Sequence, residues 1–398
     1  MLTANTKSGT RVCLGYDYKK ETLLKLRSKE DFFCPECGER VSLKLGDQRI
    51  YHFAHKRGSM CGDFYERESV YHMEGKRQLF QWLINQKINA HLEYYDREIH
   101  QRPDIMFFYN GKKYALEFQC STIPEKEFIK RTNTYCQNGY IPLWIISDNH
   151  FKQKERNVLS LSNFQFFFLR KTFDGVFYIP SYCPEKRSFH LVGSVISFSV
   201  KKALVQSSHY QINHIKIWDL LNPKILKQVR LDQWSAEIEK FNFYWSMHPS
   251  PKKNSFLHEV YIQNLNLFLL PPEIGLPVHH SIFIETSPTI WQTYLYIDVL
   301  SKKNPKEKIS IEEVEFHFKK RLSRKEVIIR KLPQLDGMRP FVAVNEYLLL
   351  LVKLGILTRK TGTLFELQRH LSKSKTNREK EEKKQEFYQK YHHILSKI

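Results

Sequence analysis

The stretch RPDIMFFYNGKKYALEFQCS, residues 102–121, decides the fold. An Asn-Gly pair between two apolar runs is the strongest short-range signal for a β-hairpin. Counting outward from Asn110-Gly111 places Asp104 roughly opposite Glu117 on the neighbouring strand. Strand side chains alternate between faces, so Gln119 shares a face with Glu117. The stretch therefore predicts two carboxylates and an amide close together on one hairpin.

The segments around this hairpin complete a compact α/β unit. Apolar residues at helical spacing predict a helix over 64–87, and residues 90–99 are typical of a strand. After the hairpin, residues 124–139 predict a helix that begins at Pro124 and ends at Gly139. The apolar run 140–147 predicts a buried strand. The order is α-β-β-β-α-β, and the helical crossover predicts that the last strand enters the sheet parallel.

The whole chain of 398 residues is too long for one ordinary domain. We divide it into a knuckle-like N-terminal domain over 1–63, an α/β domain over 64–180 and a basic, mixed and largely helical region over 181–398. Residues 164–180 predict a hairpin around Asp174-Gly175. Helices followed by a hairpin at Thr361-Gly362 predict a winged-helix-like module over 308–369, and the charged tail after residue 373 is expected to be helical.

The chain carries 63 basic and 42 acidic residues, a formal net charge of +21. The excess is +4 over residues 1–65, zero over 66–150 and +17 over 151–398. Such an excess favours a polyanionic partner, of which nucleic acid is the commonest. A neutral segment between two basic regions is typical of a catalytic core whose flanking regions bind a phosphate backbone. The alternative is a Lys-rich composition without any such partner.

Several protein classes are excluded by composition. Seven cysteines in 398 residues do not make a disulfide framework. The first fifteen residues lack the apolar core of a signal peptide. No run of about twenty apolar residues is present, so no membrane span is expected. A cytoplasmic location is the default expectation.

The facing acids of the hairpin predict a metal site. Two carboxylates at this distance repel unless a cation neutralises them, and oxygen ligands are those that Mg²⁺ prefers. Such an ion activates water for phosphodiester cleavage. The alternative is a pair of solvated acids on an exposed sheet edge, although the apolar neighbours Ile105, Leu116 and Phe118 indicate a covered sheet.

A second cluster of metal-ligand residues lies near the N-terminus. Cys34-Pro-Glu-Cys37-Gly is a knuckle that presents two thiolates to one ion, and His52 and His55 follow after a predicted hairpin. Four nitrogen and sulfur ligands suit tetrahedral Zn²⁺. The spacing of the two histidines is tighter than usual, and Cys61 is an alternative to one of them. A metal-free knuckle with buried thiols is the other interpretation.

These motifs together resemble known families. Arg102-Pro103-Asp104 followed by Glu117-Phe118-Gln119 resembles the PD-(D/E)XK nuclease motif in a variant with Gln in place of Lys, and the α-β-β-β-α-β order resembles the core of that fold. Residues 1–150 resemble the CoiA family of competence proteins more closely. The matching segments are CPECG (34–38), HFAH (52–55), YHMEGKRQL (71–79), RPDIMF (102–107), LEFQCSTI (116–123) and KRTNTYCQNGYIPLWII (130–146).

The resemblance implies roles for individual residues. It makes Asp104 and Glu117 ligands of Mg²⁺ or Mn²⁺ and Gln119 the third motif residue. A neutral amide stabilises an anion less than an ammonium does, so Lys76, with His72 one turn before it, is a candidate for the missing charge. A solvated helix face is the alternative for that pair.

Further site residues are expected around this motif. Glu93 is expected to add an acid to the site. Arg102, Arg131 and Tyr135 are candidate DNA contacts, although Arg131 and Tyr135 would also serve as a tether between their helix and the sheet.

Three functions fit these observations. The first is a metal-dependent nuclease that processes single-stranded or branched DNA in natural transformation. The second is a non-catalytic DNA-binding mediator that assists a recombinase, a partner that the family resemblance implies. The third, transcription regulation through the C-terminal module, has less support because no recognition helix stands out.

Overall fold

The computed structural model describes residues 1–47, 49–56, 58–59, 61, 68–151, 157–247, 251–335 and 340–397. The chain divides into two units, which we describe separately. The first contains Met1–Phe151, Phe164–Val192 and Ser207–Lys224; the second contains Lys152–Asn163, Gly193–Gln206 and Ile225–Ile398. The expected boundary at 63/64 lies outside the described residues. The expected boundary at 180/181 falls inside a strand, Phe177–Cys183.

The N-terminal part of the first unit is a small antiparallel sheet with the order β2-β1-β3-β4-β5. Its strands are β1 (Thr3–Thr6), β2 (Arg11–Cys13), β3 (Phe32–Phe33), β4 (Arg40–Lys44) and β5 (His52–His55), and helix α1 covers Lys20–Lys29. Buried and exposed residues alternate along β4, as expected for a sheet with one covered face. The knuckle lies between β3 and β4, and β4 pairs with β5, which confirms the predicted knuckle followed by a hairpin.

The rest of the first unit confirms the predicted element order. Helix α2 (Val70–Asn85) is followed by β6 (Ala90–Leu92), β7 (Ile105–Tyr109), β8 (Lys112–Gln119), α3 (Glu125–Gln137) and β9 (Tyr140–Ser147). Asn110 and Gly111 both have positive φ, as the predicted tight turn requires. Strand β9 pairs parallel with β8, as the crossover predicted.

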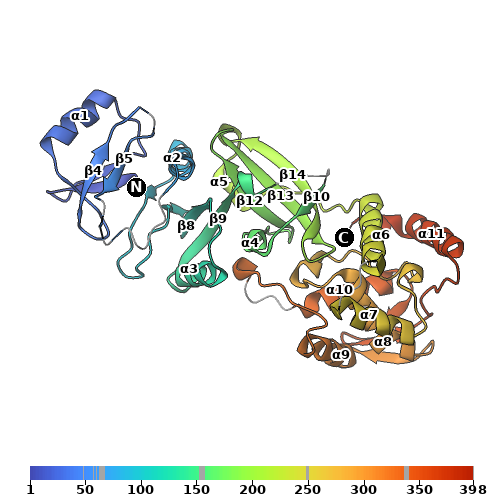
Figure 1. Cartoon of the computed structure of the whole chain (residues 1–398). Coiled ribbons are helices and arrows are strands. Elements are labelled where there is room, and N and C mark those ends of the chain that lie inside the picture. Colours follow the sequence, from blue (N-terminus) through green and yellow to red (C-terminus); the bar gives the residue numbers. More distant parts are fainter. Residues whose placement is uncertain are drawn as a thin grey trace. The chain divides into compact units, whose positions relative to one another are not determined.

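Helices α2 and α3 cover opposite faces of this sheet, and Figure 1 shows them on the two sides of β8. Leu79 and Leu83 of α2 belong to the same buried cluster as Phe118. On the other face, Phe128 of α3 stacks on Trp144 with ring centroids 4.3 Å apart. Strand alternation sends neighbouring residues to these two helices in turn, which determines the surroundings of each carboxylate.

Four further strands extend the sheet: β10 (Val158–Ser160), β12 (Phe177–Cys183), β13 (Ser188–Ser197) and β14 (Lys202–Gln211), in the order β10-β14-β13-β12-β9-β8-β7-β6. Strand β11 (Arg170–Lys171) pairs with β12 across the predicted turn at Asp174-Gly175. Short helices α4 (Asn163–Phe166) and α5 (Ile217–Leu221) accompany them. Strand β13 was not predicted, because all ten of its residues are buried and no alternation of apolar and polar residues marks a solvent face.

The second unit is largely helical. It contains α6 (Leu231–Met247), α7 (Pro251–Ile262), α8 (Pro288–Asp298), β15 (Lys308–Ser310), α9 (Ile311–Ser323), α10 (Phe341–Lys353), β16 (Leu357–Arg359), β17 (Leu364–Leu367) and α11 (Asn377–Leu395). Strands β16 and β17 form the predicted hairpin, and the sheet order is β15-β17-β16. Two helices followed by a hairpin are the features on which the winged-helix-like expectation rests.

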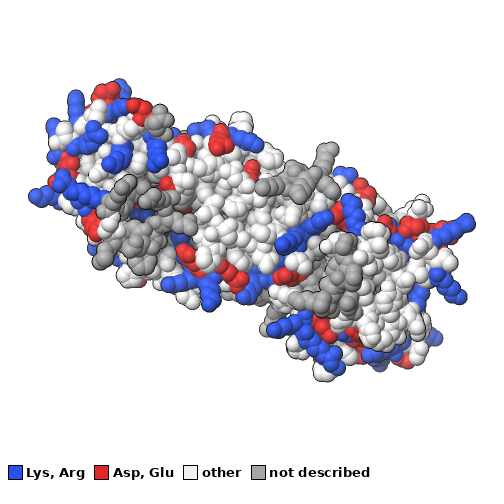
Figure 2. Space-filling model, in the orientation of Figure 1, with Lys and Arg blue, Asp and Glu red and all other residues white. Residues whose placement is uncertain are grey.

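Basic side chains are scattered over the one face of the molecule that Figure 2 shows. On the face drawn in Figure 2, Lys and Arg are interspersed with Asp and Glu, and they do not gather into one continuous patch. Within the described residues, no helix is both long enough and apolar enough to cross a membrane.

Candidate active site and metal centre

Three carboxylates lie at neighbouring positions across strands β6, β7 and β8. Ile105 pairs with Leu92 on one side and with Leu116 on the other. The next position outward therefore places Asp104 between Glu93 and Glu117, and the Glu93 backbone N–H donates to the Asp104 carbonyl at 2.7 Å. The predicted pairing of Asp104 with Glu117 follows from this register.

Asp104 is held by groups from α2 and β8. Its Oδ2 accepts hydrogen bonds from the Phe118 backbone N–H at 2.8 Å and from His72 Nε2 at 3.1 Å. Its Oδ1 lies 3.6 Å from Lys76 Nζ. Burial alone would raise the pKa of Asp104, but the positive charges of His72 and Lys76 outweigh it and lower the pKa to about 2. Asp104 is therefore ionised at neutral pH.

Lys76 connects this acid to two others. Its side chain is 1% exposed, and its Nζ donates to Glu93 Oε1 at 2.6 Å and also pairs with Glu68. Burial opposes the charge of Lys76, but these carboxylates raise its pKa above the usual value. The sequence predicted that His72 and Lys76 reach the site, and both lie beside Asp104. It missed Glu68, which precedes α2 and carries no motif signal.

Glu93 serves as an anchor for the N-terminal sheet. Its Oε2 accepts hydrogen bonds from the backbone N–H groups of Leu2 at 2.8 Å and Thr3 at 3.1 Å. With Lys76 on Oε1, both oxygens are engaged. The expected additional acid is therefore present next to Asp104, but its contacts are structural.

Glu117, the cross-strand neighbour of Asp104, is held by residues of α3. Its Oε1 accepts hydrogen bonds from Tyr135 Oη at 2.5 Å and from the Arg131 guanidinium. Burial raises the pKa of Glu117 to about 7, because Arg131 only partly offsets burial and the charge of Asp104 adds to it. A neighbouring carboxylate thus contributes to keeping Glu117 partly protonated near neutral pH.

The candidate DNA contacts are all engaged within the protein. Tyr135 is fully buried, and Arg131 donates to Glu117, so both act as the tether between α3 and β8 that was the alternative interpretation. Arg102 Nη1 lies 3.5 Å from Glu36 of the knuckle, and its side chain is 8% exposed. Because the Tyr135 hydroxyl is buried and donates to Glu117, this geometry favours the tether, and contact of Tyr135 with phosphate stays a prediction.

Gln119 is turned away from the acids in this structure. Its amide Nε2 donates to the Ser121 carbonyl at 2.9 Å. It shares the strand face of Glu117, as predicted, but no hydrogen bond joins it to Asp104 or Glu117 in the described chain.

The donor set around Asp104 and Glu117 fits a magnesium ion. Among the described residues, Asp104 Oδ1 has one ion-pair partner, the Lys76 ammonium 3.6 Å away, and Glu117 Oε2 makes no hydrogen bond. Two carboxylate oxygens with water in the remaining positions are a common Mg²⁺ environment. A cation there would also relieve the repulsion that contributes to the raised pKa of Glu117.

The second cluster combines three cysteines and one histidine. The ligand atoms of Cys34, Cys37, His55 and Cys61 all lie within 4.8 Å of one another, and Cys37 Sγ is 3.4 Å from His55 Nε2. This is the one convergent group of three or more His, Cys, Asp or Glu found among the described residues. Three sulfur ligands and one nitrogen ligand fit a tetrahedral zinc site.

His52 does not belong to this cluster. It is three residues from His55 on β5, so strand alternation places the two rings on opposite faces. The His52 Nδ1 instead lies 2.9 Å from the Ile50 carbonyl oxygen. The predicted ligand set of two cysteines and two histidines therefore changes in one residue. Cys61, which was the alternative ligand, replaces His52.

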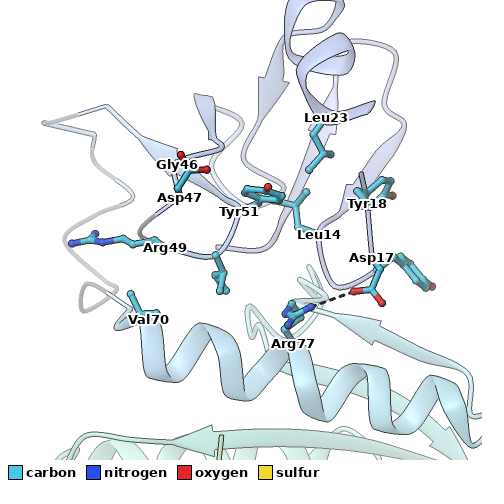
Figure 3. Close-up of a pocket in the computed structure, with 12 residues that line it drawn as sticks. Leu14, Asp17, Tyr18, Leu23, Gly46, Asp47, Arg49, Tyr51, Val70 and Arg77 are labelled. Carbon is cyan, nitrogen blue, oxygen red and sulfur yellow. Dashed lines mark hydrogen bonds and ion pairs between the residues drawn. The ribbon is translucent and has the colours of Figure 1, made fainter. Parts of the chain in front are cut away.

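A separate pocket of about 560 Å³ lies between the N-terminal sheet and α2 (Figure 3). Tyr16, Tyr18 and Tyr51 contribute to its lining, and Arg77 of α2 extends towards Asp17, 3.3 Å away. None of its lining residues belongs to the carboxylate cluster. Adjacent helix positions point about 100° apart, so α2 presents Lys76 to the acids and Arg77 to this pocket.

Comparison with known proteins covers nearly the whole chain. Three family models match: the N-terminal domain of competence protein CoiA over residues 15–64, its nuclease-like domain over 68–225 and its C-terminal domain over 229–381. The competence protein CoiA of Bacillus subtilis (strain 168) is 31% identical over 327 residues, which cover 82% of this chain and 87% of that protein. A comparison with solved structures gives no match. The chain therefore belongs to the CoiA family of competence proteins and contains a nuclease-like domain.

Proposed function

We propose that this protein processes DNA in natural transformation through a divalent-metal site at Asp104 and Glu117. The observation that carries the proposal is the cross-strand pair itself: among the described residues, one oxygen of each carboxylate makes no hydrogen bond, and the pKa of Glu117 is raised to about 7. We also assign the order α2-β6-β7-β8-α3-β9 to a PD-(D/E)XK-like core, because this order places both acids at one end of adjacent strands.

Two carboxylate oxygens would hold the metal ion, and neighbouring residues orient the two carboxylates. Asp104 Oδ1 and Glu117 Oε2 would hold Mg²⁺ or Mn²⁺, which when bound supplies Lewis acidity towards a phosphodiester and lowers the pKa of water. His72 and the Phe118 N–H fix the orientation of Asp104. Arg131 and Tyr135 fix Glu117 through its other oxygen, so both open oxygens are held in place.

Single-stranded or branched DNA is the proposed substrate. Unpaired bases stack on aromatic side chains, and the pocket beside α2 offers three tyrosines (Figure 3). Tyr16 and Tyr18 are 48% and 38% exposed, so their rings are accessible. The net charge of +21 supplies the general attraction for phosphates.

A non-catalytic mediator that presents single strands to a recombinase is the second candidate. Two observations favour it. Gln119 occupies the usual lysine position of the motif and donates to Ser121 instead of facing the acids. Lys76, the nearest ammonium, is already engaged by Glu68 and Glu93 and lies 3.6 Å from Asp104.

Cleavage of labelled DNA separates the two candidates. Single-stranded and branched substrates are incubated with Mg²⁺ or Mn²⁺ and with the wild type, Asp104→Asn, Glu117→Gln or the control Glu127→Gln. Glu127 lies exposed on α3, outside the site. The nuclease proposal expects cleavage by the wild type and the control and at least a hundredfold loss in both site variants. Tight DNA binding without cleavage by any form would support the mediator instead.

A further inference from the structure

A second pocket, of about 810 Å³, lies within the second unit and plays no part in the proposed DNA chemistry. Its apolar lining is aliphatic and comes from the segment before the 3-10 helix His279–Phe283, from α10 and from the end of α11. The apolar residues are Pro277, Val278, Leu349, Leu350, Val352 and Ile394. Such a surface favours insertion of a bulky apolar group from a ligand.

The border of this pocket is basic, and its three exposed cations have no carboxylate partner among the described residues. Lys227, Lys353 and Arg359 are exposed at it, and no ion pair in the described chain joins any of them to a carboxylate. Arg359 donates only to backbone carbonyls of its own hairpin, at 3.0 and 3.2 Å. Other lysines of this unit are neutralised: Lys380 lies 2.8 Å from Glu239, for example.

The single acid in the lining does not offset this charge. Glu346 accepts hydrogen bonds from the His280 backbone N–H at 2.9 Å and from the His280 Nδ1 at 2.6 Å, so its two oxygens are engaged. An apolar cavity beside unneutralised cations is complementary to a ligand that combines an apolar group with negative charge.

Two classes of anionic macromolecule meet that description, and the lining favours one. Nucleic-acid bases bind by stacking on aromatic rings, and no Phe, Tyr or Trp is among the residues found to line this pocket. An aliphatic cavity instead fits a Leu, Ile or Phe side chain of a peptide. We propose that this pocket binds an acidic peptide segment of a partner protein, which inserts a bulky apolar side chain against Leu349 and Val352 and places carboxylates beside Lys227, Lys353 and Arg359.

A displayed library of random twelve-residue peptides tests the proposal on the full chain. Panning against the wild type should enrich peptides that combine several Asp or Glu residues with at least one bulky apolar residue. The same library is panned against Lys227→Glu/Lys353→Glu. The matched control is Lys320→Glu/Arg324→Glu, which makes the same change of charge at exposed positions of α9 and the residue after it, outside the pocket.

Affinities then separate the outcomes. The best enriched peptide, measured by fluorescence anisotropy, should bind at least tenfold more weakly to the pocket double variant and within twofold of wild type to the control. Leu349→Gln, which leaves the net charge unchanged, should also weaken binding of this peptide severalfold. Enrichment without acidic residues, or equal binding to both double variants, would overturn the proposal. Oligothymidylate binding that falls only in the pocket double variant, without peptide enrichment, would assign the pocket to DNA instead.

Discussion

The carboxylate cluster and the cysteine–histidine cluster lie in the same unit but differ in how they are neutralised. Around Asp104 the chain supplies its own cations, since Lys76 and His72 lie beside it and Arg131 pairs with Glu117. Around Cys34 the converging groups are thiols and a histidine, and burial raises the pKa of the Cys34 and Cys61 thiols. We therefore expect the first cluster to fold without an ion and the second to need a metal ion that favours its thiolate form.

Metal removal should have the largest effect and should act on one cluster alone. Structural zinc contributes about 10–16 kcal/mol of apparent binding free energy in small zinc-finger peptides. After chelation we expect β3, β4 and β5 to lose protection in hydrogen–deuterium exchange, while β7, β8 and β9 keep it.

Two variants identify the ligands in the same experiment. Cys61→Ser should reduce the bound metal, measured by mass spectrometry, whereas His52→Ala should retain it because its ring faces Ile50. Unchanged protection of β3–β5 after complete metal loss would contradict the assigned structural role.

Lys76→Met should give the next largest effect, now on the carboxylate cluster. Removing one partner of a buried ion pair typically costs about 3–5 kcal/mol, because the other charges stay buried without compensation. Glu93 is 1% exposed, and Lys76 is the only side-chain cation that pairs with it within 4 Å among the described residues. Urea unfolding is the measurement. The exposed Lys130→Met on α3 is the control and should change the free energy of unfolding by less than about 0.5 kcal/mol.

Glu117→Gln should change how stability depends on pH. The folded-state pKa of about 7 lies above 4.5, the ordinary value for Glu, so the folded state binds more protons than the unfolded state between these pH values. Glu117 therefore destabilises the wild type progressively as the pH rises from about 4.5 to 7. Relative to the wild type, the variant should gain on the order of 1–3 kcal/mol across this window.

Denaturant unfolding at several pH values without added Mg²⁺ measures this difference. A constant difference between wild type and variant from pH 4.5 to 7 would show that the Glu117 carboxyl titrates normally.

Tyr18→Ala should have the smallest effect, a loss of affinity for single-stranded DNA. It tests whether the pocket binds DNA independently of the carboxylate cluster. Stacking of one base contributes about 1–3 kcal/mol, and at the lower end of this range the affinity for single-stranded DNA should fall about five- to tenfold. Affinity for blunt duplex should be unchanged, and the Asp104 site should be intact. Filter binding with the exposed Tyr210→Ala as control measures both. An equal loss for duplex and single strands would argue against base stacking in this pocket.

The parts predicted from sequence are those fixed by local signals. The Asn110-Gly111 turn fixed the register that sets Asp104 against Glu117, and the crossover helix fixed the direction of β9. His52 was wrongly predicted as a metal ligand. Its distance in sequence from His55 was considered, but side chains three residues apart on strand β5 point to opposite faces. Glu68 depends on a tertiary contact with Lys76 that no local pattern encodes. Strand β13 is buried on both faces and therefore lacks the alternation that marks a strand.

Binding of Mn²⁺ to the full chain, measured by electron paramagnetic resonance, tests the Asp104–Glu117 pair most directly. One oxygen on each carboxylate is open, so we expect the wild type and Glu127→Gln to bind Mn²⁺ equally. Asp104→Asn and Glu117→Gln should each weaken binding by about tenfold or more, which corresponds to a loss of roughly 1.4 kcal/mol or more. Equal Mn²⁺ binding by all four proteins, or none by the wild type, would contradict a divalent-metal site at this pair.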